Sequence, residues 1–199
     1  MKKITYLMTM LAAAWMIQGC GGSSTTTDKA DSANEAKADT SAMADSAGTN
    51  PGITVEESDA KFAVDAANGG MAEVALAKLA LQKSANAQVK EFANMMIADH
   101  GKANEELMAL AKAKNITLPA TVSEDKQKEA DDMAKKMGND FDKAYADAMV
   151  KDHEKTVKMF EHQATVAKDP DLKAFVDKTL PTLKMHTEHI AGINQYLNK

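Results

Sequence analysis

Four side chains that can ligate a metal ion lie within apolar helical patterns, one in each of four successive segments of the chain. They are Glu73, His100, His153 and His186. Each stands on a stripe of apolar residues with a period near 3.6, so each is expected to face the interior of a helical bundle. Each also falls near the middle of its segment, and helices of similar length packed side by side bring their middles to one level. Three imidazoles and a carboxylate at that level are suited to bind a divalent transition metal such as Zn, Fe, Mn or Cu.

Three further residues could support such a site. Asp99 and Asp152 directly precede two of the histidines, and each could accept a hydrogen bond from a histidine of a neighbouring helix. His189 follows His186 by three residues, which places it near the same helical face and makes it a reserve ligand. The sequence therefore predicts a metal site together with the acceptors that would orient it.

The same pattern fits a second interpretation. Buried His, Asp and Glu side chains can satisfy one another in a hydrogen-bonded layer that fixes the register of the helices and binds no ligand. Nucleophilic catalysis has little support, because Cys20 is the only cysteine and no Ser lies in a Gly-x-Ser-x-Gly turn. Three classes stay open: a protein that binds a metal, a structural or protein-interaction bundle, and a metal-dependent enzyme acting on oxidants.

The segments that carry these residues have the composition of helices. Ala, Leu, Lys, Glu and Met dominate residues 56–199, and the apolar periodicity predicts long helices at about 58–84, 86–114, 140–167 and 169–197. We expect an all-α, ferritin-like four-helix bundle with a short extra helix near 121–137 in the connection between the second and third long helices. A connection of that length can cross the bundle and make those two helices parallel. A plain up-down bundle with a peripheral fifth helix is the alternative.

The beginning of the chain predicts export. Lys2 and Lys3 precede a mostly apolar stretch that is too short to span a bilayer as a mature helix. The tetrapeptide 17–20, Ile-Gln-Gly-Cys, resembles the cleavage and acylation site of bacterial lipoproteins. Residues 1–19 would then be a signal peptide, and Cys20 the lipid attachment site that anchors the protein in the bacterial cell envelope, facing the periplasm or the outside.

The next segment predicts a spacer. Residues 20–55 are mainly Ser, Thr, Ala, Asp, Lys, Gly and Asn, with almost no large apolar side chains, so they cannot bury enough surface to offset their ordering entropy. We expect a lipid-anchored, disordered tether between the membrane and the bundle of residues 56–199.

Charge limits the range of partners. The net charge is −5, the chain has no Arg, and its one Trp lies within the predicted signal peptide. Nucleic-acid binding needs clustered positive charge and stacking side chains, so a nucleic acid is not expected as a partner. The expected partners are the membrane, through lipidated Cys20, and an envelope protein that the sequence does not identify.

Four stretches together resemble a known family. They read FAVDAANGGMAEVALAKLA at 62–80, MMIADHGKANEEL at 95–107, FDKAYADAMVKDHE at 141–154 and TLPTLKMH at 179–186. In this order they resemble the ferritin-like bacterial family called domain of unknown function 4142. The resemblance implies a four-helix bundle in exported bacterial proteins and no established activity. The Glu-x-x-His motif of di-iron carboxylate proteins is missing from this sequence, which argues against ferroxidase or oxygenase chemistry.

Overall fold

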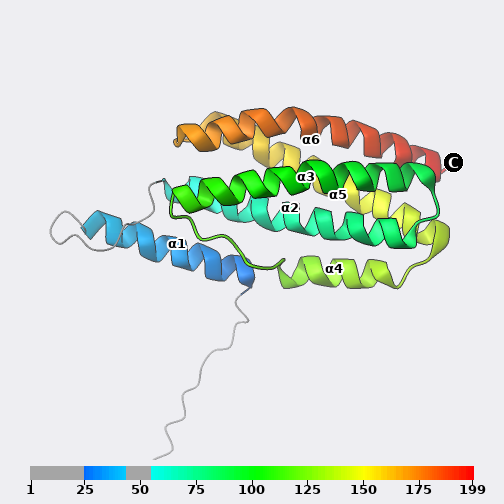
Figure 1. The fold of residues 1–199 in the computed structure, drawn as a ribbon, viewed down its shortest axis with the longest axis horizontal. Helices are drawn as coiled ribbons and strands as arrows, with labels where there is room; N and C mark the ends of the chain where they lie inside the picture. Colours follow the sequence, from blue (N-terminus) through cyan, green and yellow to red (C-terminus); the bar gives the residue numbers. More distant parts are fainter. Residues whose placement is uncertain (1–24, 44–54) are drawn as a thin grey trace, which may run out of the picture.

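The computed structural model describes residues 25–43 and 55–199, and within those residues it contains helices and no strand (Figure 1). The helices are α1 (Thr26–Met43), α2 (Glu57–Lys83), α3 (Ala87–Ala113), α4 (Glu124–Ala134), α5 (Gly138–Val166) and α6 (Pro170–Leu197). The predicted all-α fold is confirmed, and the four long helices lie within a few residues of their predicted bounds.

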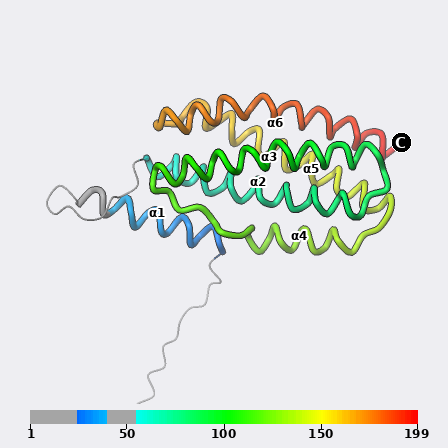
Figure 2. The backbone as a smooth tube through the Cα atoms, in the orientation of Figure 1, coloured from blue at the N-terminus to red at the C-terminus, as the bar shows by residue number. Residues whose placement is uncertain are grey.

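The four long helices pack as two antiparallel pairs. The most extensive contacts join α2 to α3 and α5 to α6, and smaller contacts join α2 to α5 and α3 to α6. Ion pairs from Lys114 to Asp169 and from Lys178 to Glu106 place the end of α3 beside the start of α6. Because α5 and α6 are antiparallel, α3 and α5 run in the same direction, and the connection that contains α4 crosses the length of the bundle (Figure 2). This is the ferritin-like crossover topology and not the plain up-down alternative.

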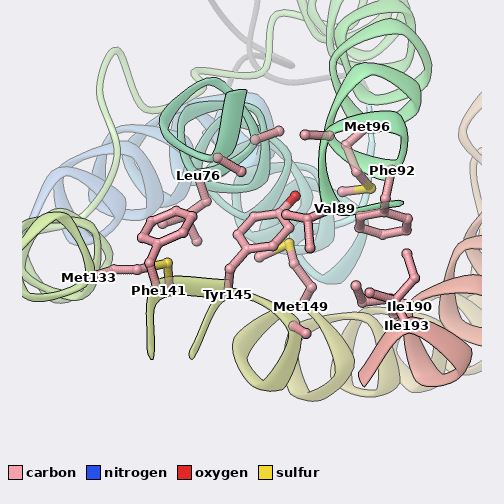
Figure 3. Close-up of a cluster of buried hydrophobic side chains, with 14 of the residues drawn as sticks. Leu76, Val89, Phe92, Met96, Met133, Phe141, Tyr145, Met149, Ile190 and Ile193 are labelled. Carbon is pink, nitrogen blue, oxygen red and sulfur yellow. The ribbon is translucent and has the colours of Figure 1, made fainter. Parts of the chain in front are cut away.

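The apolar core consists of two clusters. The first core cluster lies toward the α2–α3 turn and contains Leu76, Phe92, Phe141, Tyr145, Met149 and Ile190 among others (Figure 3). The second core cluster lies toward the opposite end of the bundle and contains Phe62, Leu107, Phe160, Leu172, Phe175 and Leu183 among others. In every long helix, the residue that the sequence singled out as a metal ligand falls between the members of the two clusters. A polar layer therefore divides the core.

Side chains at the helix ends explain why the helices begin where they do. Asn86 caps α3 by accepting from the backbone of Gln88 and Val89, and Asp169 caps α6, where Pro170 is the first helical residue. Asp59 of α2 is fully buried and accepts hydrogen bonds from the Gln163 side chain and from the backbone of the α5–α6 connection. These contacts fix the end of the bundle remote from the α2–α3 turn.

The segment expected to be a disordered tether contains a helix, so that prediction is wrong for Thr26–Met43. Small and polar residues of α1 make the contacts that large apolar residues make elsewhere. Ala30 and Asn34 are only 2% exposed, and the Asn34 amide exchanges two hydrogen bonds with the backbone of Thr117, at 2.7 and 3.0 Å. Lys37 reaches the Thr117 hydroxyl at 2.7 Å. Composition does not reveal this helix, because its partners, α2 and the loop at Thr117, are distant in the sequence.

The predicted signal peptide 1–19 and the predicted lipid attachment site Cys20 lie outside the described residues. None of the helices in the described part of the chain is long and apolar enough to cross a membrane.

Candidate metal centre

The four predicted ligands meet at one level of the bundle, one from each long helix. Glu73, His100, His153 and His186 come from α2, α3, α5 and α6 in turn, and none is more than 6% exposed. We call this set the histidine layer. One ring nitrogen from each of its three histidines lies within 4.8 Å of the others. This convergence was predicted from the sequence, because each residue lies in the middle of its helix on the face that points inward.

His153 carries a free lone pair inside the core. Its Nδ1 lies 2.9 Å from the backbone oxygen of Met149, which can only accept, so Nδ1 carries the proton. Nε2 is then the unprotonated nitrogen. It is buried and has no hydrogen-bond partner. A buried acceptor without a donor costs about 1–3 kcal/mol, so this atom marks a place where a further group would bind favourably.

The other two histidines form a hydrogen-bonded chain that ends in carboxylates. Asp99 Oδ2 accepts from His186 Nε2 at 2.9 Å, which leaves His186 Nδ1 as an acceptor. His186 Nδ1 lies 3.2 Å from His100 Nε2, and His100 Nδ1 lies 2.9 Å from Glu73 Oε2. In this chain one proton lies between His186 Nδ1 and His100 Nε2. The other nitrogen of each ring faces a carboxylate, Asp99 for His186 and Glu73 for His100.

Burial and neighbouring charges set the protonation of the layer. Burial would raise the pKa of Glu73, but the charge and hydrogen bond of His100, aided by His153, lower it overall. Burial lowers the pKa of His153 in spite of the Glu73 charge. Burial also lowers the pKa of His186 to about 4, in spite of its bond to Asp99. At neutral pH, Glu73 is ionised, and His153 and His186 are neutral, as metal binding requires.

The predicted supporting residues lie in different places. Asp99 contacts His186 of the neighbouring helix, as the sequence suggested. Asp152 does not contact a histidine nitrogen and instead binds Lys126 of α4, with both oxygens at 2.9 Å. It precedes His153 by one residue, so its side chain is turned about 100° around α5, toward α4. His189 is exposed, and its ring packs on Phe92 outside the three-histidine group.

Two features near the layer do not follow from the sequence pattern. The Tyr145 hydroxyl is buried without a hydrogen-bond partner, and burial together with the Glu73 charge raises its pKa, so the phenol stays protonated. A cavity of about 190 Å³ reaches Glu73 and His100 from one side of the bundle. Gly69 and Gly70 line it, and this pair of glycines in mid-helix is the sequence signal from which extra space beside Glu73 could have been inferred.

Fold and site together define a crossover four-helix bundle with a buried layer of three histidines and a glutamate. Within that class, the chain belongs to the family described as domain of unknown function DUF4142, which matches residues 42–193. Comparison with curated proteins gives no match.

Solved structures of similar fold were also found. One is a DUF305 fragment from Deinococcus radiodurans, with a TM-score of 0.64 and 12% identity over 71% of this chain and 98% of that chain. Another is CopM in its Cu(II)-bound form, with a TM-score of 0.60 and 19% identity over 69% of this chain and 96% of that chain. CopM in its Cu(I)-bound form matches at the same TM-score with 17% identity. At these identities the similarity establishes the fold.

Proposed function

We propose that this protein binds a transition metal ion in its histidine layer. The ligand atoms are Nε2 of His153, Nε2 of His100 and Nδ1 of His186. The observation that carries the proposal is the buried lone pair of His153, which has no donor and converges with two other imidazoles. A metal ion would accept this lone pair and would replace the proton that His100 and His186 hold between them.

The distances suit this assignment. Metal–nitrogen bonds of about 2.0–2.1 Å in a tetrahedral site place neighbouring ligand nitrogens about 3.3 Å apart. His100 Nε2 and His186 Nδ1 already lie 3.2 Å apart, and one ring nitrogen of each of the three histidines lies within 4.8 Å of the others.

Each ligand is oriented through its other ring nitrogen. His186 is held by Asp99, His153 by the Met149 carbonyl, and His100 by Glu73. Such outer hydrogen bonds fix the tautomer and ring direction of metal-binding histidines. We therefore assign Glu73 to orientation and charge balance instead of the ligand role expected from the sequence. Its oxygens lie 2.9 Å from His100 Nδ1 and 3.6 Å from His153 Nδ1, the nitrogens that face away from the ion.

Copper is the first metal to test. Imidazole ligands suit copper, zinc and iron, so the donor set alone does not choose among them. The fold-level similarity to CopM, whose solved forms hold Cu(II), Cu(I) and silver, supports copper. Zn, Fe(II) and Mn serve as comparisons.

Thermal unfolding of chelator-stripped protein tests the proposal. A metal present at 100 times its dissociation constant adds about 2.7 kcal/mol, which should raise Tm by roughly 5–10 °C for a domain of this size. His153→Ala should abolish the shift, and His162→Ala, which changes an exposed histidine of the same helix, should preserve it. Absence of any metal-dependent shift in the wild type contradicts the proposal. An equal shift in His153→Ala would mean that metal binds elsewhere.

A purely structural polar layer is the second candidate. The hydrogen-bonded chain from Asp99 through His186 and His100 to Glu73 favours it, because that chain satisfies most of the layer without a ligand. It leaves two buried atoms of the layer without a hydrogen-bond partner, His153 Nε2 and Glu73 Oε1. The same titration separates the two candidates, since a structural layer gives no shift with any metal.

For location, we propose a lipoprotein anchored through Cys20 in the bacterial cell envelope. The support is the sequence of the first twenty residues. Cys20→Ser should abolish labelling by a fatty-acid probe in cells and leave unprocessed precursor. Normal labelling of that variant would refute the anchor.

A further inference from the structure

A cavity beside the histidine layer connects it to the surface. It has a volume of about 190 Å³, enough for several water molecules, and it is partly open to solvent. On α2 its wall runs from Asp65 to Glu73, and on α5 it runs from Asp152 to Phe160. His100 is the one histidine of the layer that lines it. The cavity therefore lies on the side of the layer toward the second core cluster and ends at a proposed ligand.

The walls change from polar to apolar. Asp65, Asn68 and Lys155 lie at half-buried or exposed positions, whereas Phe160, Phe175 and Leu183 form the apolar side. The described wall carries three carboxylates and two lysines, and one of those lysines, Lys126, is ion-paired to Asp152. The carboxylates outnumber the lysines, so the charge of the cavity wall does not repel a cation. The carboxylate of Glu73 lies at the end of the cavity that reaches His100.

Two glycines of α2 line this cavity and differ in their surroundings. A Cβ at Gly70 would lie against the Asn104 side chain, so Gly70 lets α3 approach closely. A Cβ at Gly69 would meet no atom within 4 Å, although Gly69 lines the cavity. Glycine in mid-helix costs about 1 kcal/mol relative to alanine. Close packing therefore does not explain the glycine at position 69, which lines the cavity.

We propose that this cavity is the route by which the metal ion reaches the histidine layer, and that Gly69 keeps the route open. The inference rests on the proposed function, since it names the path to that site. Three observations carry it: the cavity ends at His100, it opens at half-buried residues of α2, and the other two histidines are fully buried. A side chain at position 69 would stand in the route without touching any ligand of the metal.

A blocked route has a specific kinetic signature. An obstacle between solvent and site slows association and dissociation by the same factor, because the free energies of the free and bound states are unchanged. The dissociation constant therefore stays the same. A change that damages the site itself alters the dissociation constant.

The experiment compares matched series of substitutions in the full chain. Gly69→Ala, Gly69→Leu and Gly69→Phe fill the cavity progressively, and the same three changes at Gly192, an exposed α6 glycine with no atom within 4 Å of its added Cβ, serve as controls. Cu(II) uptake is followed by stopped-flow absorbance and Cu(II) release by excess chelator. We expect both rates to fall together along the Gly69 series, by roughly tenfold or more for Phe, and to stay constant along the Gly192 series.

The outcomes separate the two proposals. If the wild type binds none of the tested metals, the proposed function fails first. If the wild type binds metal and the folded Gly69→Leu and Gly69→Phe proteins exchange it at wild-type rates, the route lies elsewhere and this inference is overturned. A weaker affinity with an unchanged association rate also overturns it, because it would show that position 69 acts on the bound state. Gly69→Ala provides a variant that should fold at least as well as the wild type.

Discussion

At the scale of single residues, the position of an acid along its helix decides what it does. Asp99 and Asp152 each precede a histidine of the layer by one residue, so each is turned about 100° away from the interior. For Asp99 that direction leads to α6 and to His186 Nε2, whereas for Asp152 it leads to α4 and to Lys126. Two similar motifs thus give one partner of the proposed site and one half-buried ion pair in the cavity wall.

This difference predicts unequal effects on metal affinity. Asp99→Ala removes the acceptor that orients His186 and should weaken metal binding roughly 10–100-fold. Asp152→Ala removes an acid at the equivalent position and should change affinity by less than about threefold, since it orients no ligand. Competition against a chelator of known affinity measures both. Equal losses would show that the acids act through long-range charge and not through the hydrogen bond to His186.

At the scale of helices, the sequence predicted the four long elements because each combines strong helix formers with a regular apolar stripe. The predicted second and fourth long helices begin at Asn86 and Asp169, and in the structure these two residues cap α3 and α6. α1 was not predicted, because it is held by tertiary contacts: it packs along α2, and Asn34 and Lys37 bind residues about eighty positions away. Local composition does not encode such contacts.

α1 should therefore contribute to the stability of the bundle. Asn34→Ala would leave the backbone N–H and C=O of Thr117 without their partners, which should lower the free energy of unfolding by roughly 1–3 kcal/mol. Glu35→Ala, at an exposed neighbouring position, should have little effect. Urea unfolding of the full chain measures both. If neither variant changes the free energy of unfolding, the contact of α1 with residues 115–121 does not stabilise the bundle. The segment would then behave as the tether expected from the sequence.

At the scale of the whole molecule, the site depends on which helices are neighbours. Four inward polar residues at mid-helix could be predicted from the apolar periodicity, and their meeting at one level does not depend on helix direction. The crossover through α4 was also expected, from the length of the connection. The unpartnered nitrogen of His153, the cavity beside Gly69 and the contact of Glu73 with His100 Nδ1 depend on side-chain placement across helices that are distant in sequence, so they required the assembled bundle.

The buried histidines should make global stability depend on pH above the range where carboxylates titrate. The pKa of His186 is about 4 in the folded protein, against an ordinary value of 6.5, because burial disfavours the charged ring. Burial also lowers the pKa of His153. Between about pH 6.5 and 4 the unfolded chain binds more protons than the folded one. Stability is therefore complete above pH 6.5 and is lost as the pH falls toward 4.

For His186 alone the loss between pH 7.5 and 4.5 should be roughly 2–3 kcal/mol, from the size of its pKa shift. Urea unfolding of chelator-treated protein at pH 7.5, 5.5 and 4.5 gives the free energies. His186→Gln cannot titrate and should lose correspondingly less over that range, although it starts from a lower stability because its bonds to Asp99 and His100 change. His162→Gln, at an exposed position, should follow the wild type. Parallel curves for the wild type and His186→Gln would mean that the pKa of His186 is the same in the folded and unfolded protein, which would contradict the lowered pKa of the buried ring.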